Sequence, residues 1–270
     1  MENIKLDNAG LTEDKLLGGR VKFRQPVSGY RVASDSVLLA SAVSAVSGSR
    51  VLDLGAGVGA ASLCLAVRVP GCQIDAVELQ PKLAHIAACN IGLNDLNSRM
   101  NLHVGDISSL PRTFSESFDH VMVNPPYLPA NRVSQESRDN LSKVEGHTLL
   151  ADWVNAASDA LCVKGCLTFI HRADRLDELL ALVRGVAGEI VVAPLWPSKG
   201  KEARRVLVRA RKGVATPLRL IAGLTLYDSE GKYTATAEAI FRNAAPFAFG
   251  SDGNGTRPAV HSRGDCWTTP

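Results

Sequence analysis

Short apolar runs recur along most of the chain, and longer stretches with helical spacing separate them. From position 50 to about position 212 these runs have the length and the β-branched content of buried strands. They are RVLDLG (50–55), QIDAVEL (73–79), MNLHVGD (100–106), FDHVMVN (118–124), CLTFIHR (166–172), EIVVAPL (189–195) and RRVLVRA (204–210). Strands that alternate with helices predict a mostly parallel sheet with helices on both faces.

The last two strands are connected differently from the others. Only WPSKGKEA (196–203) joins them, which is too short for a helical crossover, so we expect an antiparallel pair. The predicted fold class is therefore α/β. It comprises a Rossmann-like, seven-stranded, mostly parallel sheet with an antiparallel edge hairpin, plus a small N-terminal hairpin extension.

The segments on either side of this core have patterns of their own. GGRVKFRQPVSGYRV (18–32) predicts a small hairpin, and SDSVLLASAV (34–43) predicts a helix with Ser34 or Asp35 as N-cap. After the core, residues 217–245 predict a strand, a turn at DSEG and a short helix. From Pro246 onward Gly, Ser, Thr and Pro dominate without periodicity, which is typical of disorder. We therefore expect three divisions of the chain: an N-terminal hairpin and helix (1–48), the α/β core domain (49–245) and a disordered tail (246–270).

Composition narrows the class of protein. The 270 residues are 46% hydrophobic and 21% charged, which is ordinary for a globular domain. No apolar run is long enough to span a membrane, and the polar N-terminus does not resemble a signal peptide, so we expect a cytoplasmic protein. Six cysteines lack CxxC spacing, so we expect reduced, mostly buried thiols and no metal site.

The positive charge is concentrated in one segment. The net charge is only +3, but SKGKEARRVLVRARKG (198–213) contains seven Lys or Arg residues and a single Glu. Such a cluster is typical of a nucleic-acid surface and equally of the solvated face of a strand. Composition leaves both interpretations open.

A glycine-rich turn joins the first core strand to a helix in VLDLGAGVGAASLCLA (51–66). Gly55, Gly57 and Gly59 allow a ligand to approach the backbone closely, although the spacing differs from the nicotinamide fingerprint GxGxxG. Acidic residues stand at three successive strand ends: Asp53 just before the loop, Glu78 at the end of the second strand and Asp106 at the end of the third. Carboxyl ends of parallel strands share one edge of the sheet, so these acids are expected to lie together.

This constellation resembles that of class I S-adenosylmethionine-dependent methyltransferases. The resemblance implies that S-adenosyl-L-methionine is the cofactor and that the loop from Gly55 to Gly59 lies beside its methionine part. It also implies that Glu78 binds the ribose and that Asp106 meets the adenine.

The fourth strand ends in Asn124-Pro125-Pro126-Tyr127. The prolines must end the strand, which leaves the Asn124 amide at the sheet edge where ligands bind. A conjugated amino group is a poor nucleophile because its lone pair is delocalised. The Asn124 side-chain oxygen and the Pro125 carbonyl can accept both of its N–H groups and turn the lone pair toward the methyl group. Tyr127 is a candidate for stacking on a nucleobase.

In this family the motif resembles that of methyltransferases acting on adenine N6, guanine N2 or a glutamine amide. Residues 16–43 and 217–242 resemble the flanks of bacterial tRNA adenine-N6 methyltransferases, which modify an adenine beside the anticodon of a valine tRNA. That likeness makes Tyr30, Arg31 and Asp35 candidates for closing over the cofactor. Arg204 and Arg205, in the basic segment, are candidates for binding the substrate. The residues thus expected at the cofactor are Tyr30, Asp35, Asp53, Gly55, Ala56, Gly57, Gly59, Glu78, Leu79, Asp106, Ile107 and Asn124.

The expected activity is methyl transfer to an exocyclic amino group, with adenine N6 in tRNA near the anticodon as the first candidate. Three alternatives stay open: glutamine N5 methylation of a protein such as a release factor, guanine-N2 methylation of ribosomal RNA, and a non-catalytic cofactor-binding RNA chaperone. The sequence specifies neither the exact RNA nor the oligomeric state.

Overall fold

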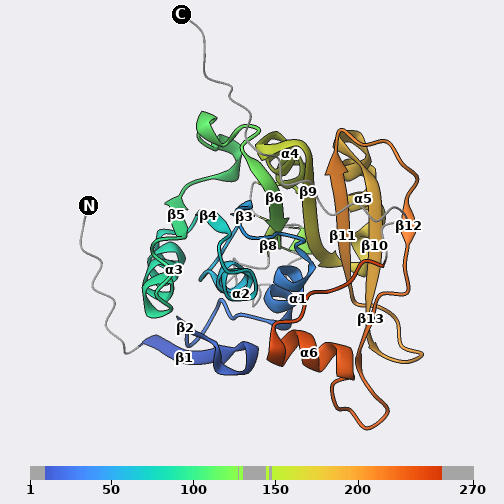
Figure 1. Cartoon of the computed structure of the whole chain (residues 1–270), viewed down its shortest axis with the longest axis horizontal. Coiled ribbons are helices and arrows are strands. Elements are labelled where there is room, and N and C mark those ends of the chain that lie inside the picture. Colours follow the sequence, from blue (N-terminus) through green and yellow to red (C-terminus); the bar gives the residue numbers. More distant parts are fainter. Residues whose placement is uncertain (1–9, 127, 130–143, 146–147, 251–270) are drawn as a thin grey trace, which may run out of the picture.

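The computed structural model of the chain describes residues 10–126, 128–129, 144–145 and 148–250. In this part of the chain a large sheet runs through the molecule, with helices on both faces (Figure 1). Its main strands are β3 (Arg50–Leu54), β4 (Gln73–Glu78), β5 (Met100–Val104), β6 (Phe118–Val123), β9 (Leu161–Arg172), β10 (Ala187–Ser198) and β11 (Arg205–Lys212). Their order is β10-β11-β9-β6-β3-β4-β5.

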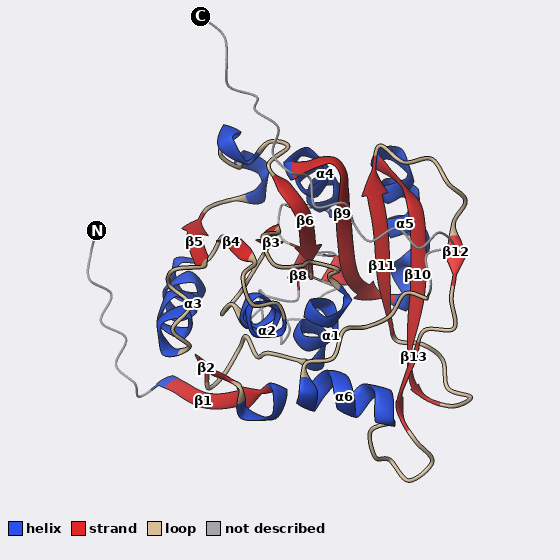
Figure 2. Cartoon of the chain, in the orientation of Figure 1, coloured by secondary structure: helices blue, strands red, loops and turns tan. Residues whose placement is uncertain are grey.

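The strand directions confirm the predicted fold class. β5, β4, β3, β6 and β9 run parallel to one another, and β10 and β11 form the expected antiparallel pair (Figure 2). β11 is antiparallel to β9 as well. However, this pair does not end the sheet. β12 (Arg219–Leu220) and β13 (Leu224–Tyr227) both pair parallel with β10, which makes nine strands in the described sheet. They satisfy N–H and C=O groups that an open edge at β10 would leave unpaired.

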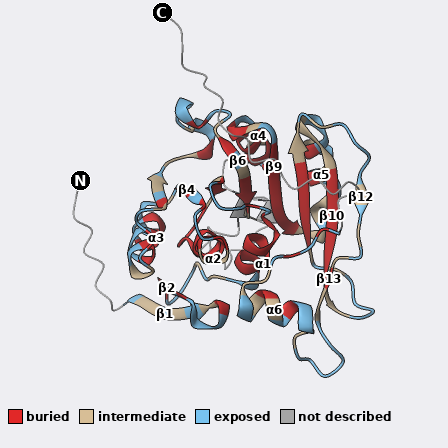
Figure 3. Ribbon diagram, viewed as in Figure 1, coloured by how far each residue is buried: buried red, intermediate tan, exposed pale blue. Residues whose placement is uncertain are grey.

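The helices cover the two faces of the sheet, and the hydrophobic core forms two clusters. One hydrophobic cluster contains residues of α1 (Ser34–Ala42), α2 (Ala60–Arg68), α3 (Pro81–Leu93) and α6 (Ala235–Asn243). The other contains residues of α4 (Leu150–Ala160) and α5 (Leu176–Val186). Figure 3 shows that buried residues concentrate in the central strands and on the helix faces toward them. None of the helices in the described ranges is long and apolar enough to cross a membrane.

The N-terminal hairpin exists, but its position differs from the prediction. β1 (Leu11–Leu16) pairs antiparallel with β2 (Val21–Pro26), so the hairpin spans 11–26 rather than 18–32. The first strand, LTEDKL, has too little apolar alternation to be recognised. It forms because the turn at Leu17–Gly19 brings it back along β2, and Gly18 takes a left-handed conformation there (φ 66°). Farther along the chain, β7 (Leu128–Pro129) and β8 (Val144–Glu145) form a short parallel pair.

The predicted N-cap of α1 is wrong. Ala33 occupies the cap position without a side-chain hydrogen bond, and Ser34 is already the first helical residue. Asp35 faces β11 instead, where its Oδ2 accepts a 2.8 Å hydrogen bond from Nε of Arg205. The carboxylate is therefore paired with a guanidinium 170 residues away in the chain.

The prediction of disorder from Pro246 is wrong for residues 246–250. Phe247 and Phe249 are 8% and 4% exposed, and their rings meet edge to face. The Phe247 N–H donates to the Ser41 carbonyl (2.8 Å), and the Arg209 guanidinium lies 4.5 Å from the Phe249 ring centroid. Burial of two aromatic rings outweighs the polar composition of this stretch. Residues 251–270 lie outside the described ranges.

Candidate active site

The glycine loop follows β3 and is bound to the end of β4. The N–H groups of Gly55 and Ala56 both donate to the Val77 carbonyl, at 2.9 and 3.0 Å. Gly57 (φ 60°) and Gly59 (φ 85°) take left-handed conformations that residues with a Cβ rarely adopt. Gly59 then leads directly into α2. The local sequence thus folds into a tight strand-to-helix turn that is held against the end of β4.

Two aromatic side chains lie against this loop. A Cβ at Gly55 would come within 2.7 Å of the Trp153 ring, and one at Gly57 would overlap the phenol of Tyr30. Burial and the nearby Glu78 carboxylate raise the pKa of Tyr30, so the phenol stays protonated. Tyr30 was expected here. Trp153 was missed, because a tryptophan in an apolar helical pattern indicates only core packing.

Glu78 ends β4 and is bound to the glycine loop. Its Oε2 accepts the Gly57 N–H and its Oε1 accepts the Gln80 N–H, both at 2.8 Å. Burial raises the pKa of Glu78, while these backbone donors oppose that shift. Each carboxylate oxygen has a second lone pair, so the geometry leaves Glu78 able to accept hydroxyl groups of a ligand.

Asp53 lies in β3, two residues before the glycine loop. It is buried, and its Oδ2 accepts a 2.6 Å hydrogen bond from the Ser62 hydroxyl on α2. Burial raises the pKa of Asp53 to about 7, with the Ser62 hydrogen bonds opposing. The contacts of this side chain therefore join β3 to α2.

The raised pKa of Asp53 predicts a pH-dependent stability. An unfolded Asp titrates near ~3.9, so between about pH 4 and pH 7 the folded state binds the proton more tightly. The contribution is full below about pH 4 and is lost as the pH rises through about 7. We expect Asp53→Asn to remove this dependence, so that its unfolding free energy relative to wild type increases from pH 5 to pH 8. Denaturant titrations of both proteins measure this, and parallel pH profiles would contradict it.

Asp106 and its neighbours continue the same edge of the sheet. The Gly105 N–H donates to the Glu78 carbonyl (3.0 Å), which places Asp106 beside the end of β4. The Asp106 carboxylate accepts the Ser108 N–H (2.9 Å) and caps the short 3-10 turn Ile107–Ser109. Ile107 is buried, whereas Leu79 is 58% exposed. An exposed leucine between two strand-end acids offers an apolar surface at the site.

The predicted acceptor motif, Asn124-Pro125-Pro126-Tyr127, begins directly after β6. β6 lies between β3 and β9, and Val123 is in register with Leu54 on one side and Phe169 on the other. Asn124 therefore leaves the sheet beside the glycine loop. Asn124 and Pro126 are half-buried and Pro125 is buried. Tyr127, the predicted stacking residue, lies outside the described residues.

Four of the predicted residues lie outside this cluster: Arg31, Asp35, Arg204 and Arg205. The guanidinium of Arg31 donates to the Thr12 hydroxyl (2.9 Å) and the Pro26 carbonyl (3.2 Å), so it holds the hairpin. Asp35 and Arg205 form the ion pair between α1 and β11 described above. Arg204 is exposed beside them. Arg205 begins β11 and Arg204 directly precedes it, at the sheet edge that carries the predicted acceptor motif, because Arg205 pairs with Arg172 at the end of β9.

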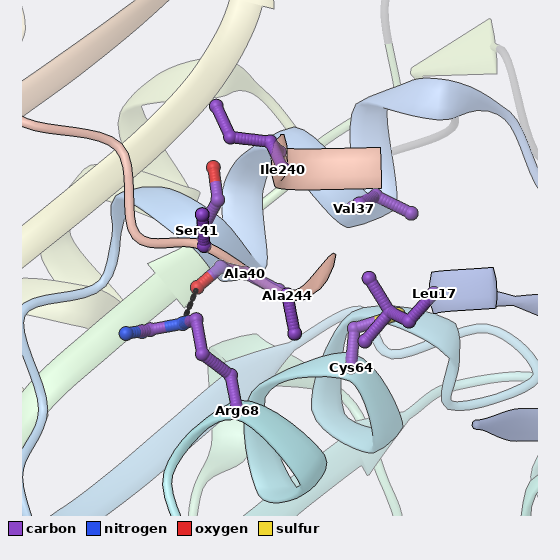
Figure 4. Close-up of a pocket in the computed structure, with 9 residues that line it drawn as sticks. Leu17, Val37, Ala40, Ser41, Cys64, Arg68, Ile240 and Ala244 are labelled. Carbon is purple, nitrogen blue, oxygen red and sulfur yellow. Dashed lines mark hydrogen bonds between the residues drawn. The ribbon is translucent and has the colours of Figure 1, made fainter. Parts of the chain in front are cut away.

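A small cavity lies between α1, α2 and α6, away from the glycine loop (Figure 4). It has about 10 Å³ of free space, enough for about one water molecule. Cys64 lines it, and burial raises the pKa of that thiol to about 12. Arg68 spans its rim and donates to the Ala40 carbonyl at 3.1 Å. The cavity is too small for a cofactor.

The strand order, the glycine loop after β3 and the acid after β4 together define a class I S-adenosylmethionine-dependent methyltransferase. The chain belongs to the methyltransferase small domain family, whose model matches residues 27–173. It is thus a methyltransferase that uses S-adenosylmethionine. The site fits this cofactor at Glu78, whose carboxylate oxygens retain lone pairs for hydroxyl groups at the carboxyl end of β4.

Two curated relatives carry the same name, tRNA1(Val) (adenine(37)-N6)-methyltransferase. The protein of Yersinia pseudotuberculosis serotype O:3 is 36% identical over 230 residues, covering 81% of this chain and 89% of the relative. That of Actinobacillus succinogenes is 28% identical, covering 76% and 85%. A crystal structure from Agrobacterium tumefaciens, titled a predicted O-methyltransferase, is 26% identical. It matches with a TM-score of 0.67 over 79% of this chain and 98% of that one.

Proposed function

We propose that this enzyme methylates the exocyclic N6 amino group of an adenine in tRNA, near the anticodon. The observation that carries the proposal is the position of Asn124-Pro125-Pro126, which leaves β6 beside the glycine loop. The names and the coverage of the two curated relatives support adenine in tRNA as the target.

The acceptor motif performs its role by positioning. The Asn124 side-chain oxygen and the Pro125 carbonyl accept the two N–H groups of the target amine and hold its lone pair out of conjugation. Two consecutive prolines keep these acceptors fixed, because each proline locks its φ. S-adenosylmethionine supplies the electrophilic methyl group. No strong general base is required, since the proton can leave after the transfer.

The surrounding residues hold the cofactor. We assign the loop formed by Gly55, Ala56, Gly57 and Gly59 to its methionine part, with Tyr30 packed on the loop. Glu78 accepts the ribose hydroxyls. Leu79, Ile107 and Asp106 line the adenine side. Asp53 and Asp35 act indirectly, through Ser62 and Arg205 respectively. In this scheme the N-terminal segment 1–48 contributes Tyr30 and closes one side of the site.

The basic turn between β10 and β11 provides the RNA contact. Lys199, Lys201 and Arg204 are exposed there, next to the sheet edge that carries the acceptor motif. We expect Arg204→Glu to weaken tRNA binding and to reduce the slope of log K against log salt by about 1. Arg184→Glu, at an exposed position on α5, makes the same charge change and is expected to leave the slope near that of wild type. Filter binding at several salt concentrations measures both, and equal slopes for the two variants would refute the contact.

The substrate is tested with labelled S-adenosylmethionine and tRNA, ribosomal RNA and protein fractions from cells that lack the enzyme. We expect label in tRNA, released on digestion as N6-methyladenine. Label in ribosomal RNA as N2-methylguanine, or in a protein as N5-methylglutamine, would refute adenine in tRNA. Tight RNA binding without label in any fraction would support a non-catalytic role.

A further inference from the structure

Two asparagines on α3 attach the N-terminal hairpin to the core. Asn90 and Asn94 lie one helical turn apart, and each exchanges two hydrogen bonds with the backbone of one residue in β2. Asn90 accepts the Arg24 N–H (2.7 Å) and donates to the Arg24 carbonyl (2.9 Å). Asn94 does the same with Lys22, at 3.0 and 2.6 Å. The two amides thereby extend the pairing of β2 in the way that another strand would.

Asn90 makes a further contact that Asn94 does not make. Its Nδ2 also donates to the Val58 carbonyl in the glycine loop, at 3.0 Å. The second Nδ2 bond of Asn94 goes to the Asn90 carbonyl within its own helix (2.7 Å). Asn90 is 0% exposed. A buried asparagine with its amide fully used is a strong constraint, because a buried carbonyl left without a donor costs about 1–3 kcal/mol in general.

Asn90 joins β2 to the glycine loop, and these two segments are also in contact through Tyr30. β2 continues into Gln25, whose side chain accepts the Val32 N–H (2.8 Å) and donates to Asp14 (2.6 Å). Gln25 thus anchors the stretch that contains Tyr30, and the phenol of Tyr30 packs on Gly57. The neighbour of Gly57 is Val58, the residue that Asn90 binds.

We propose that Asn90 is a positioning residue that keeps the glycine loop and the Tyr30 segment in one fixed arrangement before the cofactor binds. The proposal rests on the assignment of this loop to S-adenosylmethionine. Glycines give the loop little intrinsic stiffness, and ordering it on binding reduces affinity. The bond from Asn90 to Val58 supplies the missing constraint from outside the loop. Docking of the hairpin alone needs only the reciprocal pair that Asn94 also makes.

Asn94 provides a matched control. Asn90→Ala and Asn94→Ala each remove one reciprocal pair with β2, and only the first removes the bond to Val58. We expect both variants to melt at lower temperature than wild type. Only Asn90→Ala is expected to raise the dissociation constant of S-adenosylhomocysteine, by about tenfold. It should raise the KM for S-adenosylmethionine by a similar factor, with kcat at saturation and the KM for RNA within about threefold. Equal affinities in the two variants, or a loss confined to kcat, would overturn the proposal.

Amide hydrogen exchange of the ligand-free proteins provides a second test. The Gly57 and Gly59 N–H groups donate within the site, to Glu78 and to the Ala56 carbonyl. They are expected to be protected in wild type and in Asn94→Ala, and to exchange about tenfold faster in Asn90→Ala. If Asn90→Ala does not fold, wild type alone decides: fast exchange at Gly57 and Gly59 until S-adenosylhomocysteine is added would refute a preformed loop. Wild type that binds no S-adenosylhomocysteine would contradict the assigned cofactor site, while exchange would still decide the role of Asn90.

Discussion

Asn124→Ala is expected to lower kcat for methyl transfer by about a thousandfold while the affinity for S-adenosylhomocysteine stays within about threefold. Removing one preorganised hydrogen-bonding group from an active site typically costs about 10²–10³ in kcat. The side chain is half-buried at the end of β6, so its truncation leaves the sheet intact. Single-turnover rates with the RNA substrate and calorimetric titration of S-adenosylhomocysteine measure the two quantities separately.

A suitable control is Asn155→Ala, which truncates an exposed asparagine on α4. It should leave both the rate and the affinity at the values of wild type. If Asn124→Ala keeps more than about a tenth of the wild-type rate, Asn124 is not an acceptor for the target amine. If it loses cofactor affinity instead, the side chain serves the cofactor rather than the substrate.

Glu78→Ala is expected to weaken S-adenosylhomocysteine binding by about a hundredfold, or about 2.7 kcal/mol. The variant removes the carboxylate that we assign to the ribose hydroxyls. It also removes the carboxylate that holds the Gly57 and Gln80 N–H groups. Hydrogen bonds to a charged group are worth about 1.5–3 kcal/mol each, so the loss of several supports an effect of this size. Isothermal titration calorimetry measures the dissociation constant.

Glu78→Gln separates the two roles of Glu78. The one side-chain oxygen left in this variant can accept only some of the hydrogen bonds that the carboxylate accepts. The affinity of the variant for S-adenosylhomocysteine should therefore lie between those of Glu78→Ala and wild type. Glu116→Ala, which removes an exposed carboxylate paired with Lys212, should have no effect on cofactor affinity. Wild-type affinity in Glu78→Ala would mean that the carboxylate only braces the loop and does not bind the ribose.

Much of the fold follows from local patterns in the sequence. The parallel strands are buried on both faces, so their apolar runs are nearly continuous and stand out against the helical spacing between them. The glycine loop and the two prolines after Asn124 are equally local, because φ limits act within one or two residues. Because β3 and β4 are parallel, the acid at the end of β4 and the loop after β3 could be expected on one edge of the sheet.

Tertiary structure decided the features that depend on contacts between distant residues. LTEDKL is polar, and it becomes a strand only because β2 lies beside it. Phe247 and Phe249 are buried only because Phe247 hydrogen-bonds to Ser41 and Phe249 packs against Arg209, both of which are distant in the chain.

The same separation applies to the site. The sequence by itself determined the class of enzyme, the turn at the glycine loop, and the positions of Glu78 and Asn124 at the strand ends, since each depends on residues close together in the chain. The pairing of Asp35 with Arg205, the packing of Trp153 on Gly55 and the link from Asn90 to Val58 were decided by the tertiary structure. These contacts join segments that only the packing of helices on the sheet brings together, and no local propensity encodes them.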